Sequence, residues 1–287
     1  MERKVAGNLF LCATPIGNLE DITLRALRIL KEVNCIAAED TRHTRKLLTH
    51  YDIHTPLISY HSYSSESKED QLIERLLQGE DIALVSDAGM PGISDPGADL
   101  VRLALENGIT VTPIPGASAG IAGLVASGLP THKFVFEGFL SNQRKARRKH
   151  LQALRNEKRT MIFYESPHRL TDTLKDILGE LGDRPCAVAR ELTKLYEEFK
   201  RGSISEVLDY YSANHPRGEI TLVLGGQPEE EAALEQQDLW SQLTLAEHVD
   251  TLVEQGLDKK EAIKQVAQLR GVPKREVYGA VHGAGGE

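Results

Sequence analysis

The sequence predicts two consecutive α/β domains, each with helices on both sides of a sheet, followed by a small all-α unit with helix-turn-helix spacing. Short apolar runs alternate with apolar stripes at helical spacing between residues 8 and 224. This pattern stops at Gly128-Leu-Pro130 and then begins again. The composition changes later, because residues 218–258 contain no lysine or arginine. We therefore predict α/β domains at 1–125 and 126–227, a linker at 228–238 and a helical unit at 239–287.

The predicted first domain begins with strand 8–14 and a helix whose stripe includes Leu24, Leu27 and Leu30. Strands 35–39 and 57–60 follow, and a helix around 72–77 ends near Gly79. Strand 82–85 then leads into a long loop. A helix around 100–104 stops at Gly108, since glycine often ends helices. Strand 109–114 and a helix of small residues at 118–127 complete this part of the chain.

The predicted second domain alternates in the same way. Its strands are 134–136, 160–164, 186–189 and 220–224, and its helices are 143–156, 167–181 and 205–212. After the linker, helical patterns cover 243–254, 259–269 and 274–281. Gly271-Val-Pro273 separates the last two, which is the spacing of a helix-turn-helix. Two interpretations of this unit stay open: a domain that contacts nucleic acid, and a small helical bundle without such a contact.

The composition argues against several classes of protein. A chain of 287 residues that is 40% hydrophobic with mixed charge is not a disordered composition. The three cysteines lie singly in apolar runs, so we expect neither a metal site nor a disulfide. No apolar stretch approaches the ~20 residues of a membrane span. The first apolar run is too short for a signal peptide, so we expect a cytoplasmic location. Phosphate-binding GxxxxGK[ST], strand-linked GxGxxG and GxSxG motifs are absent.

Four loops follow predicted strands and are rich in glycine, proline and capping residues: 14–18, 85–97, 114–119 and 164–168. Ligands of α/β sheets bind outside the carboxyl ends of the strands, and helix starts bind carboxylates or phosphates. One such loop alone is best interpreted as a turn, but four together predict a shared site for a small polar ligand. In the long loop, we expect Asp95 to cap the next helix, with Pro96 at its first position. We expect Asp87 to accept hydrogen bonds from the ligand.

Charged side chains gather at the ends of three predicted strands, in the segments AEDTRHT (38–44), YESPHR (164–169) and ARELTK (189–194). Carboxylates and lysines in such places can act as general bases. The candidates are Glu39, Asp40, Glu165 and Lys194. For Asp40, N-capping of a helix is an equal alternative.

The most basic segment, residues 143–159, holds eight lysines or arginines and a single acid, Glu157, in a chain of net charge −8. This concentration favours binding to a phosphate backbone over a merely solvated helix face.

Seven motifs occur in a fixed order along the chain: ATPIGNLEDIT (13–23), AAEDTRHTRKLL (37–48), ALVSDAGMPGISDPG (83–97), PIPGASA (113–119), FYESPHRL (163–170), ARELTKLYEE (189–198) and GEITLVL (218–224). Together they resemble the tetrapyrrole methylase superfamily. They are most similar to its bacterial branch that methylates a ribose 2′-hydroxyl of 16S ribosomal RNA. The resemblance covers residues 8–226, and the C-terminal unit is similar to the helix-turn-helix appendage of that branch.

The resemblance implies S-adenosylmethionine in a cleft between the two α/β domains and a homodimer. It also implies methylation of a decoding-site cytidine of 16S rRNA in the small ribosomal subunit. The cofactor contacts that it implies are Pro15, Ser86, Asp87, Gly89, Ser118, Ala119, Tyr164, Glu165, Leu192, Gly218, Glu219 and Ile220. The residues that we then expect to bind RNA phosphates are Arg42, His43, Arg144, Lys145, Arg147, Arg148 and Lys149.

Such a reaction needs no metal, because the sulfonium carries its own charge and leaving group. Its main demand is alignment, with or without a general base. Two alternatives stay open from the sequence. One is a C-methyltransferase acting on a tetrapyrrole or corrin precursor, which would need a roomy apolar or cationic cavity. The other is a nucleic-acid-binding regulator that senses a ligand through the same loops.

Overall fold

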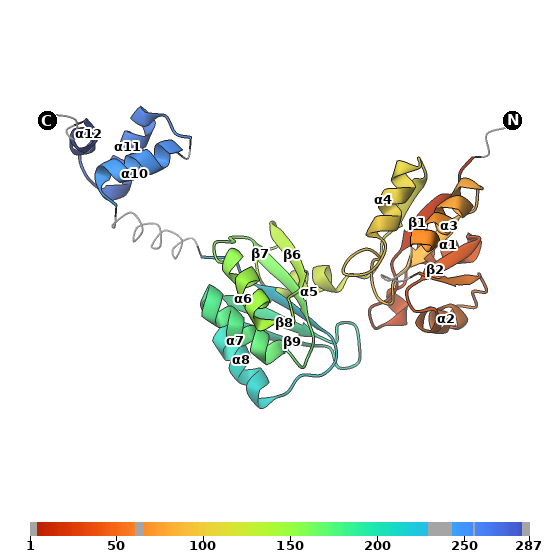
Figure 1. Ribbon diagram of the computed structural model, residues 1–287. Coiled ribbons are helices and arrows are strands. Elements are labelled where there is room, and N and C mark those ends of the chain that lie inside the picture. Colours follow the sequence, from red (N-terminus) through yellow and green to blue (C-terminus); the bar gives the residue numbers. More distant parts are fainter. Residues whose placement is uncertain (1–4, 61–65, 229–242, 255, 283–287) are drawn as a thin grey trace. The chain divides into compact units, whose positions relative to one another are not determined.

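A computed structural model describes residues 5–60, 66–228, 243–254 and 256–282. The chain forms two compact units, Met1–Gly226 and Gln227–Glu287 (Figure 1). The first unit contains two α/β halves, each built on a five-stranded sheet, and the second unit is helical. The predicted fold class is therefore confirmed. Most of the predicted linker lies outside the described residues.

The first half is built on a fully parallel sheet with strand order β3-β2-β4-β1-β5. Its elements are β1 (Asn8–Cys12), η1 (Leu19–Asp21), α1 (Leu24–Glu32), β2 (Cys35–Ala38), α2 (Thr41–His50), β3 (Leu57–Ser59), α3 (Glu66–Leu77), β4 (Ile82–Val85), α4 (Ala98–Glu106) and β5 (Thr110–Ile114).

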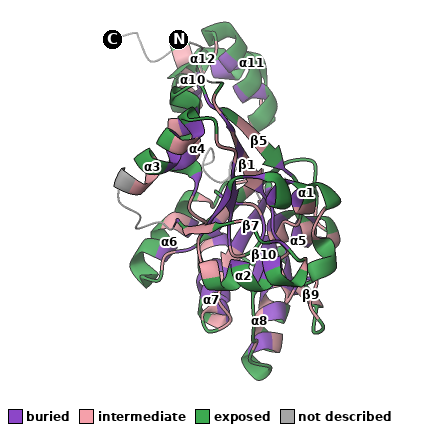
Figure 2. Cartoon of the chain, turned by 90° about the vertical axis from the view of Figure 1, so that its right-hand side faces the viewer, coloured by how far each residue is buried: buried purple, intermediate pink, exposed green. Residues whose placement is uncertain are grey.

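Helices cover both faces of this sheet, and the alternation of side chains along the strands determines which helices pack on each face. Neighbouring residues of a strand point to opposite faces. Ala37 and Leu84 share a core with α3 and α4, whereas Ile36 and Val85 share a core with α1 and α2. Strands β2 and β4 are buried along their whole length, and Figure 2 colours the buried residues of the chain purple. This explains why they read as continuous apolar runs.

The second half is built on a mixed sheet with strand order β6-β7-β10-β8-β9. Only the β6–β7 pair is parallel. Its elements are α5 (Ala119–Ser127), β6 (Phe134–Phe139), α6 (Arg144–Ala153), β7 (Thr160–Glu165), α7 (Leu170–Leu181), β8 (Pro185–Arg190), β9 (Glu198–Ser203), α8 (Ile204–Ala213) and β10 (Ile220–Leu224). The sequence did not predict β9, because this edge strand (EFKRGS) is partly exposed and lacks an apolar run.

Helix α5 corrects the predicted boundary between the two halves. Leu124 of this helix packs on Ile162 and Val223 of the second sheet. Alternate residues of the same strands face the core shared with α6, α7 and α8, so α5 covers the opposite face. A Cβ atom on Gly123 would lie 2.9 Å from Thr221, which shows how closely the helix approaches the sheet. The boundary predicted at residues 125 and 126 falls inside α5, and the packing moves it to the preceding loop.

The C-terminal unit contains α10 (Leu245–Glu254), α11 (Lys259–Arg270) and α12 (Lys274–His282), close to the predicted helical patterns. Val249, Ile263 and Val277, one from each helix, belong to a separate apolar core. Asp258 caps α11 by accepting a hydrogen bond from the backbone N–H of Lys260. No helix among the described residues is both long and apolar enough to cross a membrane.

Candidate active site

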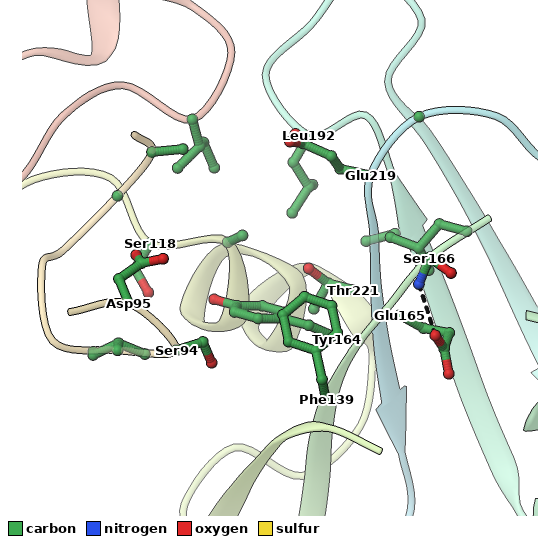
Figure 3. Close-up of a pocket in the computed structure, with 18 of the residues that line it drawn as sticks. Ser94, Asp95, Ser118, Phe139, Tyr164, Glu165, Ser166, Leu192, Glu219 and Thr221 are labelled. Carbon is green, nitrogen blue, oxygen red and sulfur yellow. Dashed lines mark hydrogen bonds between the residues drawn. The ribbon is translucent and has the colours of Figure 1, made fainter. Parts of the chain in front are cut away.

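A cavity of about 380 Å³ in the first unit is lined by residues from both halves (Figure 3). The loops after β1, β4, β5, β7 and β8 contribute to it, as expected for ligand sites at the carboxyl ends of strands. The predicted cofactor residues that line it are Gly89, Ser118, Ala119, Tyr164, Glu165, Leu192, Gly218, Glu219 and Ile220. The other lining residues were not among the predicted cofactor contacts, although several belong to the predicted ligand loops: Ile16, Ala88, Met90, Ile93, Ser94, Asp95, Phe139, Ser166, Pro167, Ala189 and Thr221.

The loops after β1 and β4 are tied to each other at the cavity. The backbone N–H of Thr14 donates to the carbonyl oxygen of Gly89 at 2.9 Å, and Gly89 returns the bond at 3.0 Å. The Thr14 hydroxyl also donates to the Ser86 carbonyl at 3.1 Å. Gly89 has φ +81°, a conformation that favours glycine. Predicted residues Pro15 and Ser86 do not line the cavity, but they adjoin or belong to this bridge.

Asp95, one of the two aspartates of the long loop, does not have its predicted capping role, and the other, Asp87, forms a hydrogen bond within the protein. Helix α4 begins at Ala98, and its N-cap is Gly97 without any side-chain capping bond. Asp95 is therefore not the cap, and it lines the cavity instead. Asp87 is the residue with a structural bond, because its Oδ1 accepts from the backbone N–H of Asp40 at 3.1 Å. Ser94 has φ +61°, so the chain departs from helical geometry just before Asp95.

Negative charge is concentrated on this side of the cavity. Burial raises the pKa of Asp95, and the nearby charge of Asp87 raises it further, against a hydrogen bond from Ser86. Burial also raises the pKa of Glu39, followed by the charges of Asp95 and Asp87. Such carboxylates repel one another and would be relieved by a cation. This side of the cavity therefore suits a positively charged ligand group.

Aromatic side chains form part of the opposite side. The Tyr164 hydroxyl accepts a hydrogen bond from the backbone N–H of Gly120 at 3.2 Å. Phe136 meets the Tyr164 ring edge-on at a centroid distance of 5.0 Å, and Phe139 lies tilted at 5.6 Å. Phe139 is 57% exposed and stands next to Tyr164 in Figure 3. These rings offer an apolar surface to a flat ligand group.

Glu165 lines the cavity, but both of its carboxylate oxygens are bound within the second half. Oε1 accepts from the Ser166 backbone N–H at 2.8 Å and lies 3.3 Å from Nε of Arg169. Oε2 accepts from the Thr173 hydroxyl at 2.6 Å. These contacts explain how a 3% exposed carboxylate is tolerated, and they give Glu165 a structural role.

Lys194 is held between two carboxylates. Its Nζ lies 2.8 Å from Oε1 of Glu191 and 2.8 Å from Oε2 of Glu219. Burial acts to lower the pKa of Lys194, but these hydrogen bonds and charges outweigh it and raise the pKa. Gly218 has φ +85°, a conformation that favours glycine, and a Cβ atom there would lie 2.1 Å from Oε1 of Glu191. Lys194 is therefore a fixed cation and a poor general base.

Asp40 serves as the N-cap of α2. Its Oδ1 accepts from the backbone N–H of Arg42 at 2.8 Å, and the Arg42 side chain also contacts this carboxylate. These bonds hold the pKa of Asp40 below its usual range. The capping alternative thus describes the observed geometry. His43, also predicted to bind phosphate, is an exposed residue of α2.

The ion pairs of the α6 arginines contradict part of the predicted phosphate-binding surface. Arg147 is 5% exposed and donates from Nε and Nη2 to Oδ2 of Asp176 at 2.8 and 2.6 Å. Arg144 binds the other oxygen of Asp176 at 3.0 Å, and Arg148 is paired with Glu180. Breaking a buried pair of this kind typically costs about 3–5 kcal/mol. Arg147 therefore joins α6 to α7 and is not available to a phosphate.

Lys145 and Lys149, the two lysines among these predicted residues, are exposed on α6. No group of three or more histidine, cysteine, aspartate or glutamate side chains in the described part of the chain is arranged to hold a metal ion.

The fold of the first unit is that of a two-domain α/β protein with a cavity at the carboxyl ends of strands from both sheets. The model of the family described as Tetrapyrrole (Corrin/Porphyrin) Methylases matches residues 8–208, and the chain belongs to this family. A relative from Halalkalibacterium halodurans, named ribosomal RNA small subunit methyltransferase I, is 52% identical over 98% of this chain and 96% of the relative. A relative of the same name from Bacillus subtilis is 52% identical over 96% of this chain and 94% of the relative.

A solved structure with the same fold is uroporphyrin-III C-methyltransferase from Thermus thermophilus complexed with S-adenosylhomocysteine. It has a TM-score of 0.53 and 21% identity, and the match covers 76% of this chain and 97% of that chain. At this identity the likeness shows the fold alone.

Proposed function

We propose that this protein transfers a methyl group from S-adenosylmethionine to the ribose 2′-hydroxyl of a decoding-site cytidine in 16S rRNA of the small ribosomal subunit. The observation that carries the proposal is the 52% identity, over almost the whole length, to relatives named ribosomal RNA small subunit methyltransferase I. The cavity between the two halves supports it, because its lining joins acidic and aromatic surfaces that match the parts of this cofactor.

The residues of the cavity fit S-adenosylmethionine in three respects. Asp95 lines the cavity, and the charge of Glu39 is close enough to interact with it. Together they provide negative charge that would stabilise a sulfonium and an ammonium group. Phe139 and Tyr164 offer flat apolar surfaces to the adenine ring. The N-terminus of α5, at Ala119, carries the partial positive charge that suits a carboxylate. When bound, this cofactor supplies a methyl group on a positively charged sulfur.

The chain's own contribution is mainly alignment of the hydroxyl with that methyl group, which is worth several kcal/mol in favourable cases. Three of the four candidate bases are engaged in interactions within the protein. Asp40 caps α2, Glu165 binds within the second half, and Lys194 stays protonated. Glu39 is the candidate that remains, because its raised pKa makes its carboxylate a better proton acceptor than an ordinary one.

The proposal extends to partners and location. We expect the small ribosomal subunit as substrate, a homodimer as the assembly and the cytoplasm as the compartment. Leu195 and Tyr196, exposed by 89% and 70%, give apolar surface that would suit contact with a second copy. Sedimentation at micromolar concentration should give twice the mass of the 31.7 kDa chain.

The proposed reaction is tested with tritiated S-adenosylmethionine and small ribosomal subunits from a strain that lacks this gene. We expect label in 16S rRNA at one cytidine, with resistance to alkaline cleavage after that nucleotide, since a 2′-O-methyl group blocks attack by the 2′-oxygen. Subunits from the parent strain should accept no label. Transfer to a uroporphyrin instead, or no transfer to the subunits, would overturn the proposal.

A further inference from the structure

A second basic surface lies on α2. The side chains of six residues line a surface hollow of about 580 Å³: Thr41, Arg42, Arg45, Lys46, Thr49 and His50. Residues spaced by four lie on the same face of a helix, so these six residues form one continuous face of α2, which we call the α2 face. The other side of the helix is anchored in the first half by the buried residues Thr44, Leu47 and Leu48.

The charge on this α2 face is less neutralised than the charge on α6. Arg42 contacts Asp40 at 3.2 Å, but the Arg42 side chain is 90% exposed, so this pair is weak. Within the described part of the chain, Arg45 and Lys46 form no ion pair, and residues 41–50 include no acid. On α6, by contrast, Asp176 and Glu180 bind all three arginines of the segment RKARRK.

The α2 face begins beside the cavity. The residue before α2, Asp40, donates its backbone N–H to Asp87, and the next residue after Asp87, Ala88, lines the cavity. The helix has ten residues and therefore extends about 15 Å from this point, at a rise of about 1.5 Å per residue. A polynucleotide with one sugar in the cavity would carry its neighbouring phosphates over this distance.

We propose that the α2 face holds the RNA phosphates next to the methylated nucleotide, with Arg45 and Lys46 as its main contacts. The inference rests on the proposed function and adds the surface that receives the substrate. Arginine and lysine on an exposed face bind phosphates through charge and release the counterions of the RNA. Such contacts position the strand without reading its sequence.

The test is the double variant R45Q/K46Q of the full chain, because glutamine removes both charges and keeps a good helix propensity. Binding to small ribosomal subunits is measured over a range of salt concentrations, and S-adenosylhomocysteine binding is measured by calorimetry. We expect about tenfold weaker RNA binding at moderate salt. The slope of log affinity against log salt should become shallower by about 1.4–1.8, at about 0.7–0.9 for each of the two lost contacts. Cofactor affinity should be unchanged, which also shows that the variant is folded.

Two further variants make the result specific. R25Q/K31Q removes one exposed arginine and one exposed lysine from the neighbouring helix α1 and should leave RNA binding within twofold of the parent protein. K145Q/K149Q removes the two exposed lysines of α6 and should have a smaller effect than R45Q/K46Q. Equal binding of R45Q/K46Q and the parent protein, or a larger loss in the α6 variant, would overturn the inference. If the parent protein itself methylates no small subunit, it is the proposed function that fails.

Discussion

The two sides of the cavity treat their carboxylates in opposite ways. On the side of the first half, Glu39 and Asp95 have raised pKa values, chiefly because they are buried near other acids. On the side of the second half, Lys194 bridges Glu191 and Glu219, and Glu165 is paired with Arg169. Among the described residues, Glu39 and Asp95 have no ion-pair partner, whereas the carboxylates of the second side are paired with Lys194 and Arg169. A cationic ligand should therefore interact mainly with the first side.

The opposite pKa shifts have opposite effects on stability. Glu39 and Asp95 have folded pKa values above their ordinary values of 4.5 and 3.8, so they favour the folded state below those values. That contribution is lost as the pH rises through the raised pKa. Glu191 has a lowered pKa, mainly because it accepts a hydrogen bond from Lys194. Its contribution is present above its ordinary value of 4.5 and is lost as the pH falls.

The largest effect should come from Asp95→Asn, which keeps the shape of the side chain and removes its charge. We expect about tenfold weaker binding of S-adenosylmethionine, a loss of about 1.4 kcal/mol. S-adenosylhomocysteine, whose sulfur is neutral, should lose much less. Calorimetry with both compounds measures the difference. The matched control is Asp172→Asn, an exposed aspartate of the second half that does not line the cavity, which should change the two affinities by less than twofold. Equal losses for both compounds with Asp95→Asn would show that Asp95 shapes the site without a charge effect.

A smaller effect should appear when the pH is lowered from 7 to 5. Protonation of Asp95 and Glu39 begins above their ordinary values of 3.8 and 4.5, because burial has raised both pKa values. S-adenosylmethionine affinity should therefore fall as the pH is lowered, in the same direction as the loss caused by Asp95→Asn. S-adenosylhomocysteine serves as the comparison in the same buffers. An unchanged ratio of the two affinities between pH 7 and 5 would contradict the charge difference between the two sides.

The smallest effect should come from Lys194→Met, which tests the second side. Without the ammonium group, Glu191 and Glu219 face each other unpaired, and we expect the free energy of unfolding at pH 7 to fall by about 0.5–1 kcal/mol. The loss should shrink as the pH is lowered towards 4, since the carboxylates then become protonated. Urea unfolding at both pH values measures it. Lys175→Met, which removes an exposed lysine 3.9 Å from Asp172, is the control and should have almost no effect. A loss that grows at low pH would contradict this account.

Much of the fold could be predicted from local patterns. The apolar run of residues 82–85 becomes β4, buried on both faces, and the C-terminal helices lie close to their predicted positions. The glycine- and proline-rich loops lie at the cavity, since strand ends in α/β sheets collect at one edge. Helix α5 was placed with the wrong sheet, because a helix of small residues has no apolar stripe that favours one neighbour.

The individual tasks of charged residues were harder to predict. Asp87 and Asp95 are eight positions apart in the same loop, and their roles depend on where α4 begins. A signal for this existed in Gly97, since a glycine just before the helix can replace an aspartate as the N-cap. Phe139 had a weaker signal, an aromatic residue at the end of a strand next to Gly138.

By itself, the sequence determined the alternation of strands and helices, the loops that could meet a ligand and the motifs of a methylase family. Those properties depend on neighbouring residues and on the periodicity of the chain. Only the tertiary structure decided that Arg147 is buried against Asp176, 29 positions away, and that Arg45 stays exposed. The availability of a charge depends on the partners that folding brings to it, and those partners can lie anywhere along the chain.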